Sequence, residues 1–195
     1  MDLIPQGTRV RKSGRFFTVL LWLGLLALTG PAAFGADHAV SKEYQLKAAF
    51  LYNFSKFVQW PPERFTDEKS PIVIAVLGDN PFGDELENAV RGRLVNGRSI
   101  IIKIIDRLEQ AGAAQVLFVE AKEERRLGDS LALLHRAGVL TVGETRQFAA
   151  MGGIITFTLA EDKVRFEINQ LAGEQAGLKI NAQLLKLATP VRKSS

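Results

Sequence analysis

The chain of 195 residues contains no cysteine, which excludes disulfides, cysteine-ligated zinc, iron–sulfur clusters and thiol nucleophiles. It has only two histidines, His38 and His135, so histidine-based metal sites and catalytic triads have few residues to draw on. Charged residues make up 24% of the chain and hydrophobic residues 47%. This balance excludes a disordered or low-complexity protein and is typical of one globular domain with a short additional segment.

The positive charge of the chain is concentrated at its start. Residues 1–35 hold four basic residues and one acidic residue, which leaves +1 of the overall charge of +4 for residues 36–195. In those later residues we find no basic stripe with interleaved aromatic residues. The basic isoelectric point therefore does not indicate a nucleic-acid-binding protein.

The first 35 residues resemble a secretory signal. A basic stretch, Arg9–Arg15, precedes the apolar run Phe16–Thr29, and the small residues Ala33 and Gly35 follow with the spacing that a signal peptidase requires. The apolar run is shorter than the about 20 residues of a membrane span. We predict a cleaved signal peptide over residues 1–35 and a domain outside the cytoplasm over residues 36–195, with an uncleaved anchor as the alternative. Lipid attachment to a cysteine is excluded.

Alternation of apolar runs with amphipathic segments predicts a single α/β domain with a mostly parallel central sheet flanked by helices. A first helix is expected over Lys42–Gln59, capped by Ser41 and ended by the two prolines at 61 and 62. The expected strands are Ile72–Leu77, Ser99–Ile105, Gln115–Glu120 and Val139–Val142. The expected connections are helices over Asp84–Arg91 and Lys122–Ala137 and a short crossing over Leu108–Gly112.

The last part of the chain changes pattern. Runs Gly153–Leu159 and Lys163–Asn169 flank a short polar turn, which predicts an antiparallel hairpin at the sheet edge, and a final helix follows Asn181. In the second run apolar residues alternate with polar ones. Glu167 is therefore expected to be exposed, either as a contact for a partner or as a solvated charge that discourages edge pairing.

A turn over Gly78–Gly83 follows the first expected strand and carries Asp79 and Asn80, while Glu120 and Glu144 follow two other strands. The carboxyl ends of parallel strands meet at one edge of a sheet, so Asp79, Asn80 and Glu144 form a candidate ligand pocket. Turn formation and helix capping are the alternative interpretation. No carboxylate pair has the spacing of a metal site, and no phosphate-binding or hydrolase motif is present. We therefore predict no cofactor, no metal and no enzymatic activity.

The first expected helix is rich in aromatic residues, which are Phe50, Tyr52, Phe54, Phe57 and Trp60. Core packing is one interpretation of this helix. Its apolar surface also extends beyond a single stripe, which favours either complete burial or contact with a partner.

Four segments together resemble the YfiR family of bacterial periplasmic regulators. They are Lys47–Pro61, Ile74–Gly78, Val164–Asn169 and Ala176–Ala188, and the resemblance covers residues 42–188. The resemblance implies an α/β domain that dimerises and that binds the outer domain of an inner-membrane diguanylate cyclase. Binding holds the cyclase inactive, which lowers cyclic-di-GMP and restrains biofilm formation.

The resemblance also implies that Glu167 contacts the partner, and we expect Arg165, Asn169 and Ile155 near it as further candidates for the partner-binding surface. Family members of this type carry a disulfide before the strand that matches Val164–Asn169, whereas Phe148–Gly153 contains no cysteine here. Redox control of that kind is therefore not expected. Two other hypotheses remain: a periplasmic small-molecule sensor that feeds a histidine kinase or other receptor, and a metal-dependent hydrolase that uses Asp79, Glu120 and Glu144.

Overall fold

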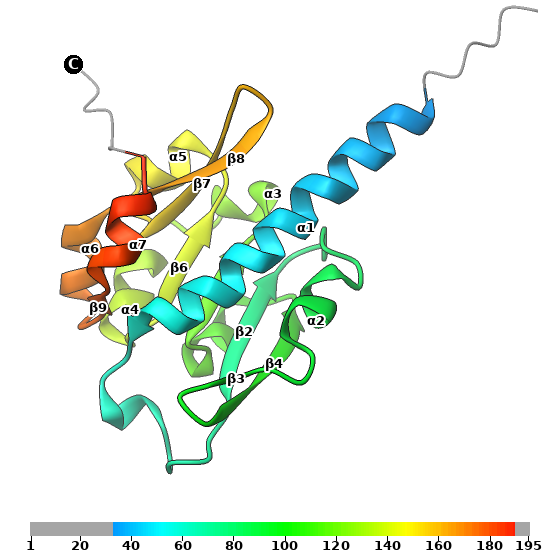
Figure 1. The fold of residues 1–195 in the computed structure, drawn as a ribbon. Helices are drawn as coiled ribbons and strands as arrows, with labels where there is room; N and C mark the ends of the chain where they lie inside the picture. The colour runs from blue at the N-terminus through cyan, green and yellow to red at the C-terminus, as the bar shows by residue number, and fades with distance from the viewer. Residues whose placement is uncertain (1–32, 190–195) are drawn as a thin grey trace, which may run out of the picture. The chain divides into compact units, whose positions relative to one another are not determined.

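The computed structural model describes the backbone of residues 33–189 and the side chains of residues 42–189 (Figure 1). Almost all of the expected signal peptide lies outside the described residues. No helix within the described part combines the length and the apolar character needed to cross a membrane.

The centre of the fold is a seven-stranded sheet with the order β3-β4-β2-β5-β6-β7-β8. Strands β4 (Arg98–Ile105), β2 (Ile72–Leu77), β5 (Val116–Val119), β6 (Leu140–Gly143) and β7 (Ile155–Ala160) are parallel to one another. At one edge β8 (Lys163–Ile168) pairs antiparallel with β7, and at the other β3 (Leu94–Val95) pairs antiparallel with β4. The predicted fold class, a mostly parallel sheet with a C-terminal hairpin at its edge, is confirmed.

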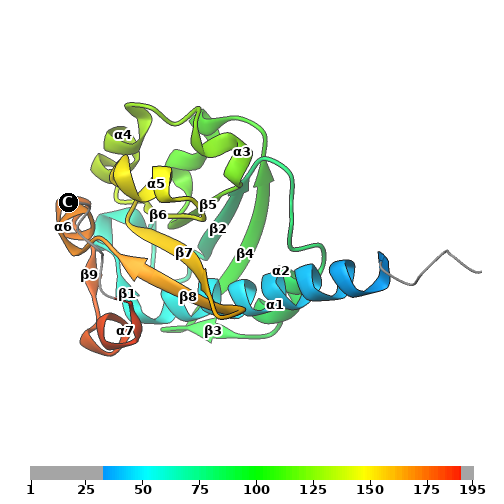
Figure 2. The same cartoon turned by 90° about the horizontal axis from the view of Figure 1, so that it is seen from above.

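Helices lie on both faces of this sheet (Figures 1 and 2), and an apolar layer of side chains covers each face. One layer contains side chains of α1 (Ala33–Phe57), α2 (Glu85–Val90), α6 (Gln170–Gln175) and α7 (Ala182–Leu187). The other contains side chains of α4 (Ser130–Arg136), α5 (Arg146–Ala150) and the 3₁₀ helix η2 (Leu108–Ala113), with Leu127 from the turn after α3 (Ala121–Glu124). In β2, Ile74 and Val76 face the first layer while Ala75 and Leu77 face the second. Burial on both faces explains why this strand reads as a continuous apolar run.

Helix α1 differs from its predicted bounds. It begins at Ala33, so Ser41 lies inside the helix and is not its N-cap. No proline occurs between positions 31 and 61 to stop a helix earlier. At the other end the helix stops at Phe57, because Val58 and Gln59 form the short strand β1, which pairs with β9 (Lys179–Ile180). A 3₁₀ helix, η1 (Pro62–Arg64), follows.

The predicted helix over Lys122–Ala137 is wrong as a single element. The structure divides it into α3 and α4, which are separated by a turn containing Gly128 at φ +43°. A glycine adopts this left-handed conformation without the steric cost that a side chain would add. Helix α6 and strand β9 were not predicted, since both are short and lie in the polar stretch before Asn181.

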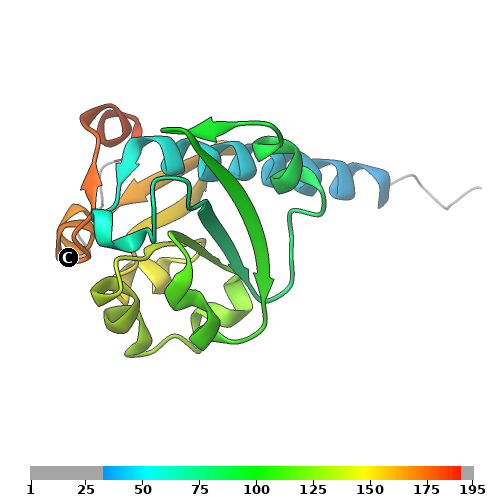
Figure 3. The same ribbon diagram turned by 90° about the horizontal axis from the view of Figure 1, so that it is seen from below.

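The two edges of the sheet are covered to different extents. The β7–β8 hairpin turns at Glu161 and Asp162, which both have positive φ, and Ala160 pairs with Lys163. On the outer side of β8, Thr189 forms a bridge with Glu167. At the opposite edge β3 pairs only with Arg98 and Ser99, so among the described residues the rest of β4 has no strand on its outer side (Figure 3).

Candidate functional site

The polar side of the β7–β8 hairpin carries the candidate partner-binding residues. Glu167 on β8 lies opposite Thr156 on β7, and Arg165 lies opposite Thr158. The apolar residues Phe157 and Phe166 point to the other side, where they contact Phe50 and Phe54 of α1. The alternation predicted from the sequence therefore places Glu167 and Arg165 on one side of the hairpin.

Glu167 lies at the wall of a shallow pocket of about 260 Å³. The pocket is lined by Ala149, Gly153, Thr156, Glu167, Ile168, Asn169 and Gln170. Burial in this pocket makes Glu167 half-buried instead of fully exposed as expected. Within the described residues its carboxylate forms no ion pair. A half-buried carboxylate without a cation is a suitable partner for a basic group from outside the domain.

Small residues create the floor of this pocket. A Cβ placed on Gly153 would lie 2.1 Å from the ring of Phe148, which is completely buried beneath it. Only glycine allows the chain to pass so close to the aromatic ring. We name the surface formed by Gly153, Thr156, Glu167 and Gln170 the Glu167 pocket.

The other candidate partner-binding residues have different positions. Arg165 is exposed and available to a partner. Asn169 caps α6, because its side-chain oxygen accepts a hydrogen bond from the backbone N–H of Ala172 at 3.0 Å. Ile155 is 0% exposed, so its side chain does not reach the surface on which Glu167 lies. Its burial follows from its place in β7, between β6 and β8.

The residues of the candidate ligand pocket have separate local contacts. Asp79 is exposed, 3.4 Å from Lys122 Nζ. Asn80 shapes its own turn by accepting from the N–H of Phe82 at 3.1 Å and donating to the carbonyl of Gly83 at 3.2 Å. Glu120 caps α3 by accepting from the N–H of Lys122. Among the described residues no three acidic or histidine side chains are placed to hold a metal ion.

The hollow at this end of the sheet is basic in character. It has a volume of about 320 Å³ and is lined by Ala121, Lys122, Arg125, Thr145 and Gln147. The candidate ligand pocket predicted from the sequence consisted of Asp79, Asn80 and Glu144, and none of these three is among the residues that line this hollow. Glu144 instead points toward α1.

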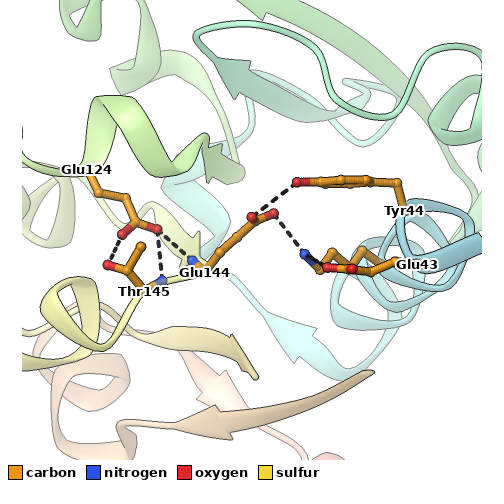
Figure 4. A network of polar contacts seen from close by, with 6 residues as sticks. Glu43, Tyr44, Glu124, Glu144 and Thr145 are labelled. Atoms are coloured by element: carbon orange, nitrogen blue, oxygen red, sulfur yellow. Dashed lines mark hydrogen bonds and ion pairs between the residues drawn. The ribbon is translucent and has the colours of Figure 1, made fainter. Parts of the chain in front are cut away.

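Glu144 belongs to a partly buried ionic cluster that links the end of β6 to α1 (Figure 4). The ammonium group of Lys47, whose side chain is 4% exposed, lies 2.5 Å from Glu43 Oε1 and 3.1 Å from Glu144 Oε1. Tyr44 donates a hydrogen bond from its hydroxyl to Glu144 Oε2 at 3.2 Å, and its ring lies 4.5 Å from the Lys47 nitrogen. We name Glu43, Tyr44, Lys47 and Glu144 the α1–β6 cluster.

The carboxylate of Glu124 holds the loop that carries Glu144. Glu124 is completely buried and accepts hydrogen bonds from the backbone N–H groups of Glu144 and Thr145 at 2.5 and 3.2 Å. The hydroxyl of Thr145 also donates to Glu124. These bonds replace the water that a buried carboxylate loses, and they fix the loop between β6 and α5. The loop in turn directs the Glu144 side chain toward α1.

Burial affects the acid–base behaviour of the α1–β6 cluster. Loss of water around Glu144 raises the pKa of its carboxyl, and the nearby Lys47 offsets only part of that rise. Burial, together with the charge of Glu144, also raises the pKa of the Tyr44 hydroxyl, so that this group remains a hydrogen-bond donor. The cluster therefore holds one carboxyl that takes up a proton more readily than it does in the unfolded chain.

Replacing Glu144 by Gln is expected to change how stability depends on pH. Because the pKa of Glu144 is raised in the folded state, its contribution to stability declines as pH rises from the unfolded-state pKa through the folded-state pKa. The decline is at most about 1.4 kcal/mol per pH unit. Urea unfolding of both proteins between about pH 4 and pH 7 measures the difference. The stability of the natural chain relative to the variant should fall as pH rises. A relative stability that rises with pH would show that pairing with Lys47 outweighs burial.

Comparison with known proteins gives a family and several similar solved structures. A profile of the family described as YfiR/HmsC-like matches residues 44–189. One of the similar solved structures is a conserved domain protein from Vibrio cholerae O1 biovar El Tor str. N16961, with 11% sequence identity and a TM-score of 0.48. The match covers 76% of the present chain and 60% of that chain.

Proposed function

The chain belongs to the YfiR/HmsC-like family, and on that premise we propose that it is a non-enzymatic regulator in the periplasm. In this proposal it binds the outer domain of an inner-membrane signalling protein, a diguanylate cyclase, and holds the cyclase inactive. Cyclic-di-GMP then stays low and biofilm formation is restrained. Residues 1–35 would direct export of the domain.

The observation that carries this proposal is the unpaired carboxylate in the Glu167 pocket. Glu167 is half-buried, forms no ion pair within the described residues and lies beside a pocket of about 260 Å³. A partner that inserts an arginine or lysine side chain would form a charge-assisted hydrogen bond there. Arg165 on the same side of the hairpin would select against partners with a second basic group close by.

Inhibition through this surface requires a difference in affinity. A bound protein shifts the equilibrium between two states of its partner only if it binds one state more tightly than the other. The β7–β8 hairpin is suited to that task, because its apolar side is fixed by Phe50 and Phe54 of α1. A rigid surface distinguishes between two partner conformations better than a flexible one.

Replacing Glu167 by Lys is expected to lower partner capture at least about tenfold, since the variant places a cation opposite the partner's own basic group. The measurement is recovery of the membrane partner from detergent extract with the tagged chain, together with cellular cyclic-di-GMP. Glu87→Lys is the matched control, because Glu87 is exposed on α2. Equal recovery by Glu167→Lys and Glu87→Lys would remove the Glu167 pocket from the interface. No specific protein recovered by the natural chain would overturn the proposed function.

A further inference from the structure

The hollow of about 320 Å³ lies at the carboxyl ends of two parallel strands. Ala121, Lys122 and Arg125 follow β5, whereas Thr145 and Gln147 follow β6, and we name the surface formed by these five residues the Arg125 hollow. In open α/β sheets, ligands bind outside the carboxyl ends of strands, where the strand order reverses. Here the chain continues from β2 to β4 on one side of β2 and then to β5 on the other. The Arg125 hollow therefore lies next to the place where this class of sheet binds ligands.

Side chains fill the space between the ends of β2 and β5 themselves. A Cβ placed on Gly78 would lie 2.8 Å from Glu123 Cγ and 3.3 Å from Glu120 Cβ. The turn after β2 is thus packed directly against the start of α3, which leaves no space for a ligand between them. The open space lies one strand further along, between the loops that follow β5 and β6.

The lining of the Arg125 hollow carries an excess of positive charge. The described residues that form it include two cations and no acidic side chain. Within residues 42–189, Arg125 forms no ion pair. Lys122 lies 3.4 Å from Asp79, but these side chains are 74% and 88% exposed, so water weakens their attraction. The buried carboxylate of Glu124 already accepts hydrogen bonds from Thr145. Both cations are therefore available to a ligand.

We propose that the Arg125 hollow binds a small molecule that carries a phosphate group. A guanidinium group forms two parallel hydrogen bonds with phosphate oxygens, and the ammonium group of Lys122 adds a second positive charge. The side-chain amide of Gln147 supplies a further donor. At about 320 Å³ the hollow has room for an organic part of the ligand as well as the phosphate group.

The proposed site shares a helix with the Glu167 pocket. In α5, Gln147 lines the Arg125 hollow and Ala149 lines the Glu167 pocket. Phe148, which lies between them in the sequence, is completely buried against Gly153. A ligand bound to Gln147 therefore contacts the helix that supports the proposed partner surface. This link to partner binding rests on the proposed function, whereas binding of the ligand does not.

Titration of the isotope-labelled chain with glycerol 3-phosphate, followed by NMR, tests the site. We expect saturable shifts of the backbone amide signals of Ala121 and Gln147, which line the Arg125 hollow. Arg125→Gln is expected to raise the dissociation constant at least about tenfold, because it removes the two-bond contact with the phosphate group. The absence of saturable shifts in the natural chain would overturn the proposal.

Arg126→Gln is the matched control for Arg125→Gln. Arg126 is exposed, pairs with Glu123 at 3.0 Å and is not among the residues that line the hollow. Both variants remove one positive charge, so a general effect of charge would be equal in the two. We expect Arg126→Gln to change the dissociation constant less than about twofold. Equal weakening by the two variants would reduce the effect to overall charge and overturn the proposal.

Asp79→Asn distinguishes this site from an acidic ligand pocket. The substitution releases Lys122, so glycerol 3-phosphate should bind about two- to threefold more tightly. Weaker binding by this variant would show that Asp79 itself holds the ligand. Succinate and inorganic phosphate should bind more weakly than glycerol 3-phosphate, and tighter binding of either would contradict the proposed ligand class. No partner is present in these titrations, so a failed proposed function would leave their results unaffected.

Discussion

Replacing Lys47 by Met is expected to lower the free energy of unfolding by about 3–5 kcal/mol. Lys47 is 4% exposed and lies between Glu43 and Glu144, so the substitution removes the cation and leaves two partly buried carboxylates uncompensated. Methionine keeps a similar volume, which limits the loss of packing. Chemical denaturation followed by the fluorescence of Trp60 measures the change.

Two further variants separate charge from packing at Lys47. Lys42→Met changes an exposed lysine on the same helix and is expected to alter stability by less than about 0.5 kcal/mol. The double variant Lys47→Met, Glu144→Gln should recover part of the loss, because it removes the unpaired charge as well. A loss for Lys47→Met no larger than for Lys42→Met would contradict a structural role for the α1–β6 cluster.

Replacing Phe54 by Ala is expected to have an effect of similar size, about 3–5 kcal/mol. The Phe54 ring is completely buried, and its centre lies 5.7 Å from that of Phe157 and 5.1 Å from that of Phe166. The substitution removes the two Phe54 contacts with the hairpin, leaves those of Phe50, and creates a cavity that the surrounding strands cannot fill. Thermal and urea unfolding check the prediction.

Phe65→Ala provides the matched control for Phe54→Ala. The Phe65 ring is half-buried and stacks on the guanidinium group of Arg98 at 3.9 Å. We expect Phe65→Ala to lower the free energy of unfolding by less than half as much as Phe54→Ala, because part of the Phe65 ring is exposed to water in the folded chain. Similar losses for the two variants would mean that the aromatic cluster under α1 contributes nothing beyond ordinary burial.

Both predictions concern the same helix, but they act on different parts of the sheet. Lys47 links α1 to Glu144 at the end of β6, whereas Phe54 links α1 to β7 and β8. Loss of the Phe54 contacts frees the apolar side of the hairpin whose polar side carries Glu167. Weaker partner binding by Phe54→Ala is therefore an indirect effect, and Glu167→Lys remains the direct test of the surface.

Strands were predictable from the sequence where burial of one or both faces of the strand sets the order of apolar and polar residues. Ile72–Leu77 was predicted with its observed bounds, because a strand buried on both faces reads as an unbroken apolar run. The antiparallel hairpin was predictable because β8 has one polar and one apolar side. Helix bounds were less predictable. Ser41 is a good local N-cap, but the residues before it form helix as well, and Gly128 divided a segment whose leucine spacing suggested continuity.

The candidate site was predictable only in part. The alternation in β8 placed Glu167 and Arg165 on one side, but it did not predict the half-burial of Glu167, which depends on Ala149 and Gly153 from a different segment. Glu144 was chosen for its position after a strand, whereas its contacts are with Lys47 and Tyr44, about a hundred residues away in sequence. No local pattern reports an ion pair between such distant residues. The sequence feature that could have indicated this ion pair is Lys47, a charged residue close to the aromatic residues of the first helix.

The uncovered part of β4 has a consequence for the behaviour of the chain at high concentration. Five isoleucines, at 100, 101, 102, 104 and 105, lie on β4 beyond Arg98 and Ser99, where no other strand within residues 33–189 pairs with its outer side. Such a strand is a template for edge-to-edge association into fibrils. Lys103 stands among these isoleucines and is exposed, so two copies aligned antiparallel about this residue bring like charges together. The charge of Lys103 thus opposes edge-to-edge pairing of β4 strands and favours the dispersed protein over the aggregate.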